Sequence, residues 1–79
     1  MTKDLKLGMK NKDVKILQSF LINQNKGPFA LALKKHGATN NFGALTKLAL
    51  EEWQKTNSVI PSTGYFGTKT RAKIKLLNL

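Results

Sequence analysis

The sequence predicts an all-α domain, a compact three-helix bundle with a long connection between its first and second helices. Three segments repeat their apolar residues at helical spacing, and nearly all of the glycine, proline and asparagine lies between them. A chain of 79 residues is long enough for one small core, so we expect residues 1–79 to form a single domain. Because cysteine is absent, stability has to come from packing alone.

The first predicted helix runs from about residue 11 to residue 23. Val14, Leu17 and Leu21 recur at positions i, i+3 and i+7, which places them on one face. Asn11 is the predicted N-cap, because its side chain can accept a hydrogen bond from a free backbone N–H of the first turn. The start of this helix is therefore well defined.

A long connection over residues 24–41 follows, interrupted by Gly27-Pro28 and by the cluster from Gly37 to Asn41. The stretch over residues 29–35 inside it is compatible with a short helical turn or with a strand. A structureless connection of this length is unusual in a compact domain. We therefore expect it to be either a functional surface or a lid over the core.

The second and third predicted helices span about residues 44–57 and 68–77. In the second, Leu45, Ala49 and Trp53 are separated by four residues each and form an apolar stripe. None of the three helices can bury its stripe alone, so we expect them to pack on one another. The corresponding apolar side of the third helix holds Thr70, Ile74 and Leu77.

An internal repeat is the most informative feature of the sequence. Residues 42–47 and residues 66–71 both follow the pattern Phe-Gly-x-x-Thr-basic, with an offset of 24 residues, and both copies open a helix. An aromatic ring at this place can plug the end of the bundle, and glycine permits the tight backbone turn beside it. We therefore expect Phe42 and Phe66 to belong to the core.

These features together resemble the peptidoglycan-binding domain family, compact three-helix modules that anchor bacterial and phage lytic enzymes to the cell wall. The family pattern has a Leu-x-x-Gly opening, a Val-x-x-Leu-Gln helix, a Phe-Gly box, an aromatic-Gln pair and a second box. The resemblance covers almost the whole chain and is specific as a set. The matching residues, in order, are Leu5, Gly8, Val14, Leu17-Gln18, Leu21, Phe42-Gly43, Thr46, Trp53-Gln54, Thr63-Gly64-Tyr65-Phe66-Gly67 and Thr70.

The chain departs from the family pattern beside both boxes and after the second helix. The proline that usually follows Phe-Gly is Ala44 in the first copy and Thr68 in the second. The family usually ends its second helix with Asn-Gly, whereas this chain has Asn57-Ser58. We expect Asn57 to take the left-handed conformation that ends a helix.

The resemblance implies a non-catalytic module that binds peptidoglycan or another anionic cell-wall polymer and targets an attached or partner enzyme to the bacterial wall. It implies an extracellular location and a place within a larger cell-wall-active protein. We expect a monomer without a cofactor. The N-terminal residues lack the apolar stretch of a secretory signal. The longest apolar run, Phe29 to Leu33, is far below the ~20 residues of a membrane span.

Six polar side chains are the candidate ligand contacts. Tyr65 follows a glycine and precedes a core phenylalanine, so its ring should face outward, where it can stack on a sugar or donate a hydrogen bond. The glutamines lie at the edge of the apolar stripes, where they either satisfy loop backbone groups or reach a ligand. The asparagines are turn formers whose amides can also reach sugar groups. The candidate residues are Tyr65, Gln54, Asn57, Gln18, Asn40 and Asn41.

The net charge of +10 favours anionic partners and keeps an alternative open, a small basic helical domain that binds nucleic acid. The third predicted helix offers mostly lysine with a single arginine, Arg71, whereas base reading favours Arg, Asn and Gln. A domain that docks on a partner enzyme is the third possibility. The sequence shows no exposed apolar stripe that would mark such a surface.

The residues that catalysis needs are too few for an enzyme. His36 stands alone, without cysteine and with few carboxylates to complete a metal shell. Glu51 and Glu52 are neighbours in the sequence and splay apart on a helix, so they cannot face one substrate. We therefore expect neither a catalytic centre nor a metal site.

Overall fold

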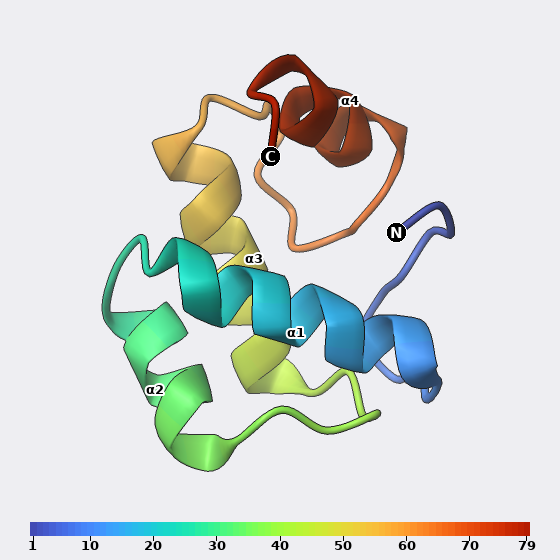
Figure 1. The fold of residues 1–79 in the computed structure, drawn as a ribbon, viewed down its shortest axis with the longest axis vertical. Helices are drawn as coiled ribbons and strands as arrows, with labels where there is room; N and C mark the ends of the chain where they lie inside the picture. The colour runs from blue at the N-terminus through green and yellow to red at the C-terminus, as the bar shows by residue number, and fades with distance from the viewer.

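The computed structural model describes residues 1–79 and contains four helices, with no strand beyond two isolated bridges. In Figure 1, α1 crosses α3, α2 lies near the lower end of α3, and α4 lies at the opposite end of the molecule. The all-α prediction is confirmed, with a fourth helix in the long connection. The helices are α1 (Lys12–Gln24), α2 (Pro28–His36), α3 (Ala44–Thr56) and α4 (Thr68–Leu76).

Helix α1 begins as predicted. The Asn11 side-chain oxygen accepts a hydrogen bond from the Val14 backbone N–H at 3.1 Å, which confirms Asn11 as the N-cap. Val14, Leu17 and Leu21 are all buried, which confirms the predicted apolar face. The helix ends where Asn25 adopts a left-handed conformation, with a φ of 49°.

Helix α2 forms in the connection that the sequence left open between a helical turn and a strand. Pro28 is its first residue, where a missing N–H costs nothing. The Glu52 carboxylate of α3 accepts hydrogen bonds from the Phe29 and Ala30 backbone N–H groups, both at 3.0 Å. This carboxylate satisfies the free N–H groups of α2 and complements its dipole. Because Ala30 and Leu33 are buried, α2 covers one side of the core.

Trp53 of α3 lies at the centre of the core. Its ring packs edge-on against Phe20, with 5.6 Å between the ring centroids, and its indole N–H donates to the Gln24 side-chain oxygen at 3.1 Å. Phe42 and Phe66 are also buried, so both predicted core plugs are confirmed. The aromatic side chains of this stripe are therefore packing residues rather than free sugar platforms.

The end of α3 differs from the prediction. Asn57 has a φ of −103°, and Ser58 instead takes the left-handed conformation with a φ of 58°. The reason is local, because the Asn57 backbone N–H and side-chain amide both donate to the Trp53 backbone oxygen at 3.0 Å. These two bonds keep Asn57 on the helical turn, and the chain reverses one residue later.

The N-terminal segment joins the two Phe-Gly copies, which the sequence did not predict. The Leu5 N–H donates to the Phe66 oxygen at 2.9 Å, and the Phe66 N–H donates back to Leu5 at 2.8 Å. Three residues on, the Gly8 N–H donates to the Phe42 oxygen, and the Phe42 N–H donates to the Met9 oxygen, both at 2.9 Å. One N-terminal segment, residues 5–9, therefore bonds to the backbone of both copies.

Candidate ligand-binding site

The first turn, residues 39–46, leads into α3 and is held by Gln18 of α1. The Gln18 amide nitrogen donates to the Asn41 backbone oxygen at 2.8 Å and to the Thr46 hydroxyl at 2.9 Å. The Gln18 side-chain oxygen accepts a hydrogen bond from the Thr39 backbone N–H. This side chain is 2% exposed. One buried amide therefore ties α1 to the start of α3.

The second turn, residues 63–70, leads into α4 and repeats this arrangement around Gln54 of α3. The Gln54 amide nitrogen donates to the Tyr65 backbone oxygen at 2.9 Å and to the Thr70 hydroxyl at 3.0 Å. The Gln54 side-chain oxygen accepts from the Gly64 backbone N–H at 2.8 Å. The side chain is 1% exposed. We call each glutamine with its three partners a glutamine frame.

Both glutamines were candidate ligand contacts, and their geometry assigns them to the frames. Both hydrogens of each amide nitrogen and the carbonyl oxygen of Gln18 and of Gln54 are engaged inside the protein. No buried side-chain nitrogen or oxygen in the chain lacks a partner. A ligand would have to break these internal bonds to reach either amide, so the two glutamines position the turns.

Each turn bounds a shallow cleft, and the two clefts occupy equivalent positions of the repeat. The first cleft has a volume of about 320 Å³ and the second of about 250 Å³. An offset of 24 residues relates the turn residues of one cleft to those of the other. At these positions the first cleft is lined by Thr39, Asn41, Gly43, Ala44, Leu45 and Thr46, and the second by Thr63, Tyr65, Gly67, Thr68, Lys69 and Thr70. The frame glutamines, Gln18 and Gln54, line the two clefts as well.

At the equivalent positions of the two turns, the clefts differ at three side chains that take no part in the glutamine frames. The second cleft carries the ring of Tyr65, the hydroxyl of Thr68 and the ammonium of Lys69. These groups can stack on a sugar ring, bond hydroxyls and acetamides, and attract an anion. At these three positions the first cleft has one amide and two apolar side chains, and Leu33 and His36 line it as well. An aromatic ring, a hydroxyl and an ammonium at the three positions therefore distinguish the second cleft. The first-cleft residues at these positions are Asn41, Ala44 and Leu45.

Tyr65 is held in one pose by its surroundings. Its hydroxyl donates to the Asp4 carboxylate at 2.7 Å, and the other oxygen of Asp4 pairs with Arg71. The ring lies on Gly67, where a Cβ atom would stand only 2.6 Å from the ring edge. The guanidinium of Arg71 lies 5.8 Å from the centre of the Phe66 ring and is thereby held in place. Tyr65 remains 42% exposed, so a fixed aromatic ring faces solvent.

The charges around Tyr65 reinforce this pose. The hydrogen bond from the Tyr65 hydroxyl, followed by the contact with Arg71, lowers the pKa of Asp4 below its ordinary value. The same hydrogen bond to the Asp4 carboxylate raises the pKa of the Tyr65 phenol. At neutral pH Asp4 is therefore charged and Tyr65 is protonated, which are the forms that the contact requires.

A groove adjoins the second cleft, between residues 58–60 and α4, with a volume of about 360 Å³. Val59 and Lys69 line both depressions, and the Lys69 ammonium donates to the Ile60 backbone oxygen at 3.2 Å. Ile60 and Leu76 in its walls are each 76% exposed. The expectation that no apolar stripe is exposed is therefore wrong at this α4 groove, because Ile60 lies in the turn before α4 and Leu76 is its last residue, both outside the predicted helix stripes.

The other predicted residues lie apart from the second cleft. Asn40 and Asn41 are exposed on the first turn, and Asn57 is half-buried at the end of α3. Tyr65 and Gln54 are the predicted residues that line the second cleft. A comparison of the two turns at the positions where their side chains differ would have identified more residues of the second cleft. The cleft and groove residues that the sequence reasoning missed are Thr68, Lys69 and Lys73.

Three of the four carboxylates make structural contacts within the protein. Asp4 pairs with Arg71, Asp13 lies 3.6 Å from Lys3, and Glu52 caps α2. Nowhere do three or more His, Cys, Asp or Glu residues gather as they would around a metal ion. None of the four helices combines the length and apolar character that crossing a bilayer requires.

The chain is a small all-α module with two repeated turns, each of which bounds a surface cleft. The chain belongs to the peptidoglycan-binding domain family, because the family model described as "Putative peptidoglycan binding domain" matches residues 10–74. This match includes both turns and both glutamines, and it confirms the resemblance seen in the sequence. Association with the cell wall follows from membership of this family. No curated protein and no solved structure matches the chain.

Proposed function

We propose that this chain is a non-catalytic module that binds peptidoglycan in the second cleft and thereby holds an attached or partner enzyme at the cell wall. The observation that carries the proposal is the contrast between the two clefts. Both are built on the same glutamine frame, and at the equivalent turn positions the second carries Tyr65, Thr68 and Lys69, whose ring, hydroxyl and ammonium suit a sugar and an anion.

Tyr65 is the proposed sugar contact. Its ring is already fixed by Asp4 and Gly67, so little side-chain entropy remains to be lost when a sugar stacks on it. Gln54 acts beneath it by holding the turn. Asn40 and Asn57 stay outside the proposed site because neither lines the second cleft, and Asn41 belongs to the first cleft.

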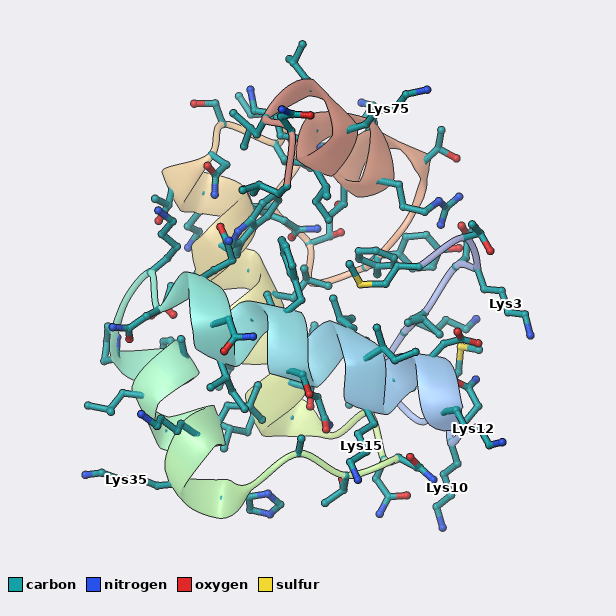
Figure 2. The ribbon with its side chains drawn as sticks, viewed as in Figure 1. Lys3, Lys10, Lys12, Lys15, Lys35 and Lys75 are labelled. Atoms are coloured by element: carbon teal, nitrogen blue, oxygen red, sulfur yellow. The ribbon has the colours of Figure 1, made fainter.

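The positive surface supports attraction to the wall. Of the 14 Lys and Arg side chains, two, Lys3 and Arg71, form ion pairs within the protein. Figure 2 shows Lys10, Lys12 and Lys15 extending into solvent around the start of α1. Peptide stems and anionic wall polymers carry the complementary charge. Single contacts of this kind are weak, so retention depends on the many repeats of the polymer and on avidity in the whole protein.

Co-sedimentation with purified peptidoglycan sacculi tests the proposal. We expect sacculi to deplete the protein from solution, and Y65A to bind at least about fivefold more weakly because the stacked ring contributes roughly 1 kcal/mol or more. The matched control is N41A, the equivalent position of the first turn, which should bind like the unchanged protein. Both frames use backbone oxygens at these positions, so neither variant removes a frame bond.

Two outcomes would contradict the proposal. If sacculi leave the protein in solution even at low salt, the proposed peptidoglycan binding is wrong. Alternatively, Y65A and N41A would lose binding to the same extent, which would remove the assignment to the second cleft. Thermal unfolding of both variants serves as the control for folding.

The structure weakens the nucleic-acid alternative at the residue best suited to it. Arg71, the arginine of α4, is held by Asp4 and lies over Phe66, so it is not free to read a base edge. We expect a gel-shift assay to show weak binding that disappears as salt rises and that Y65A leaves unchanged. A complex that survives physiological salt would favour the alternative.

A further inference from the structure

The α4 groove has a chemical character different from that of the second cleft. Its apolar walls are formed chiefly by Val59, Ile60 and Leu76. Its charged side chains are the lysines Lys69 and Lys73, and Ser58 adds a hydroxyl. Ile60 and Leu76 are the two most exposed large apolar side chains in the protein. Apolar surface of this kind beside fixed charge is typical of a site that receives a ligand with both aliphatic and anionic parts.

The positive charge of the groove is not neutralised by the protein. No carboxylate lines it, and neither Lys69 nor Lys73 forms an ion pair. The Lys69 ammonium is held against the Ile60 backbone oxygen at 3.2 Å, which places a charge where the groove meets the second cleft. A ligand that lies in both depressions therefore passes this ammonium.

We propose that the α4 groove binds the peptide stem of peptidoglycan while the glycan strand lies in the second cleft. In this arrangement stem carboxylates contact Lys69 and Lys73, and the short aliphatic side chains of the stem pack on Ile60 and Leu76. This inference rests on the proposed function and adds to it the part of the polymer that is recognised. The protein then reads two chemically different parts of one ligand at adjoining sites.

The chemistry of the polymer favours the stem as the occupant. The sugars of the glycan strand offer hydroxyls and acetamides, which suit Tyr65 and Thr68, but a fully substituted strand has no free carboxylate. The stem, which is covalently attached to the strand, carries both carboxylates and methyl groups. Because strand and stem are joined, their sites have to adjoin, and the shared residues Val59 and Lys69 provide that continuity. A nucleic acid would satisfy the lysines but would leave the apolar walls without a partner.

NMR titration of the whole chain with a soluble stem tetrapeptide tests the inference, with a stem-free glycan oligosaccharide titrated separately. We expect the tetrapeptide to shift amide signals of residues 58–60 and 69–76, and the oligosaccharide to shift those of residues 63–68. K73Q should weaken tetrapeptide binding about fivefold through loss of one charge-assisted contact. I60S should weaken it about threefold through loss of apolar contact, and because Ile60 is exposed the variant keeps its fold.

K75Q is the matched control, since it removes the same charge from the same helix at a residue outside the groove. Figure 2 shows Lys75 extending outward from α4, and we expect K75Q to bind the tetrapeptide like the unchanged protein. Equal losses in K73Q and K75Q would reduce the effect to overall charge and overturn the inference. Failure of the tetrapeptide to shift any groove amide would also overturn the inference. In that case, binding to sacculi that still depends on Tyr65 would leave the proposed function intact. If the unchanged protein also fails to bind sacculi, both the inference and the proposed function are wrong.

Discussion

The two turns of this molecule share one construction and differ in what they present to solvent. In each, a buried glutamine, Gln18 of α1 or Gln54 of α3, holds a backbone oxygen, a backbone N–H and a threonine hydroxyl. In each, a threonine side chain also accepts from a backbone N–H two residues on, at 3.2 Å, and these threonines are Thr39 and Thr63. The second turn adds the ring of Tyr65, which the first turn replaces with Asn41.

The comparison indicates that some positions of the repeat hold the fold, whereas others are available for contact with a ligand. Positions that the two copies share, such as Thr46 and Thr70, are buried and bonded to a glutamine. Positions at which they diverge face the clefts and are free to vary, because no frame bond uses their side chains. The shared positions therefore account for the fold, and the divergent positions are where ligand chemistry is expected.

The largest expected effect is the loss of either glutamine frame. Q54A leaves the Gly64 N–H, the Tyr65 oxygen and the Thr70 hydroxyl without their partner, and Q18A does the same in the first turn. Each unsatisfied buried group costs about 1–3 kcal/mol, so we expect each variant to lose about 3 kcal/mol of unfolding free energy. Chemical denaturation measures this loss.

The control for the frames is S19A, an exposed position next to Gln18 that should change the unfolding free energy by no more than about 0.5 kcal/mol. A loss below about 1 kcal/mol in one glutamine variant and not in the other would show that the frames are unequal, contrary to the observed geometry.

A smaller effect on binding is expected to distinguish Gly67, which precedes α4, from Gly43, which precedes α3. Ala at Gly67 would push the Tyr65 ring from its place, whereas a Cβ at Gly43 meets nothing within 4 Å. Both glycines are N-caps with negative φ, so both variants share a cost of up to about 1 kcal/mol for alanine at that position. We expect G67A to lose sacculus binding as far as Y65A does, and G43A to bind normally.

Co-sedimentation and thermal unfolding, run in parallel, separate the two contributions for the glycine variants. Normal binding by G67A would mean that the fixed pose of the Tyr65 ring is irrelevant to the ligand.

The smallest expected effect concerns the protonation of the Tyr65 contact. The pKa of Asp4 is lowered in the folded protein, so the charged Asp4 stabilises the fold above the ordinary aspartate pKa. This contribution to folding stability is lost as the pH falls below about 4, through the pKa of Asp4 in the folded protein. The raised Tyr65 pKa means that the stabilisation is present below about pH 10 and is lost as the pH rises through the folded value. The hydrogen bond between Tyr65 and Asp4 is therefore expected to stabilise the fold at every pH between about 4 and about 10.

Substituting Asp4 tests this assignment without a ligand. The chain has one tyrosine, so its ultraviolet titration reports Tyr65 alone. D4N should lower the Tyr65 pKa, because the carboxylate that favours the protonated phenol is gone, and D13N should leave it unchanged. An equal response to both substitutions would show that the shift follows net charge rather than the hydrogen bond.

Local sequence signals were sufficient for much of the fold. Apolar periodicity found α1, α3 and α4, and the Asn11 cap and the buried Phe42 and Phe66 follow from residue chemistry within a few positions. The signals failed where the stabilising group is distant in sequence. Helix α2 depends on the Glu52 carboxylate, which lies 22 residues beyond Ala30, and no window around α2 contains it.

The site was harder to predict than the fold for the same reason. Tyr65 was found because it stands beside a core residue, but its partner Asp4 lies 61 positions away. The glutamines were placed correctly in the helices, and whether they face a ligand or a turn depends on contacts 10 to 28 residues apart in sequence. Lys69 and Lys73 gave no signal, because twelve other basic side chains surround them in the sequence.

The central claim, that the second turn binds peptidoglycan and the first only supports the fold, is tested most directly by mapping amide shifts on the unchanged protein. The titrant is a soluble muropeptide, a disaccharide with its stem attached. We expect amide signals of residues 58–76 to shift with added ligand and those of residues 39–46 to stay in place. Shifts of equal size in both turns, or shifts confined to the first, would contradict it.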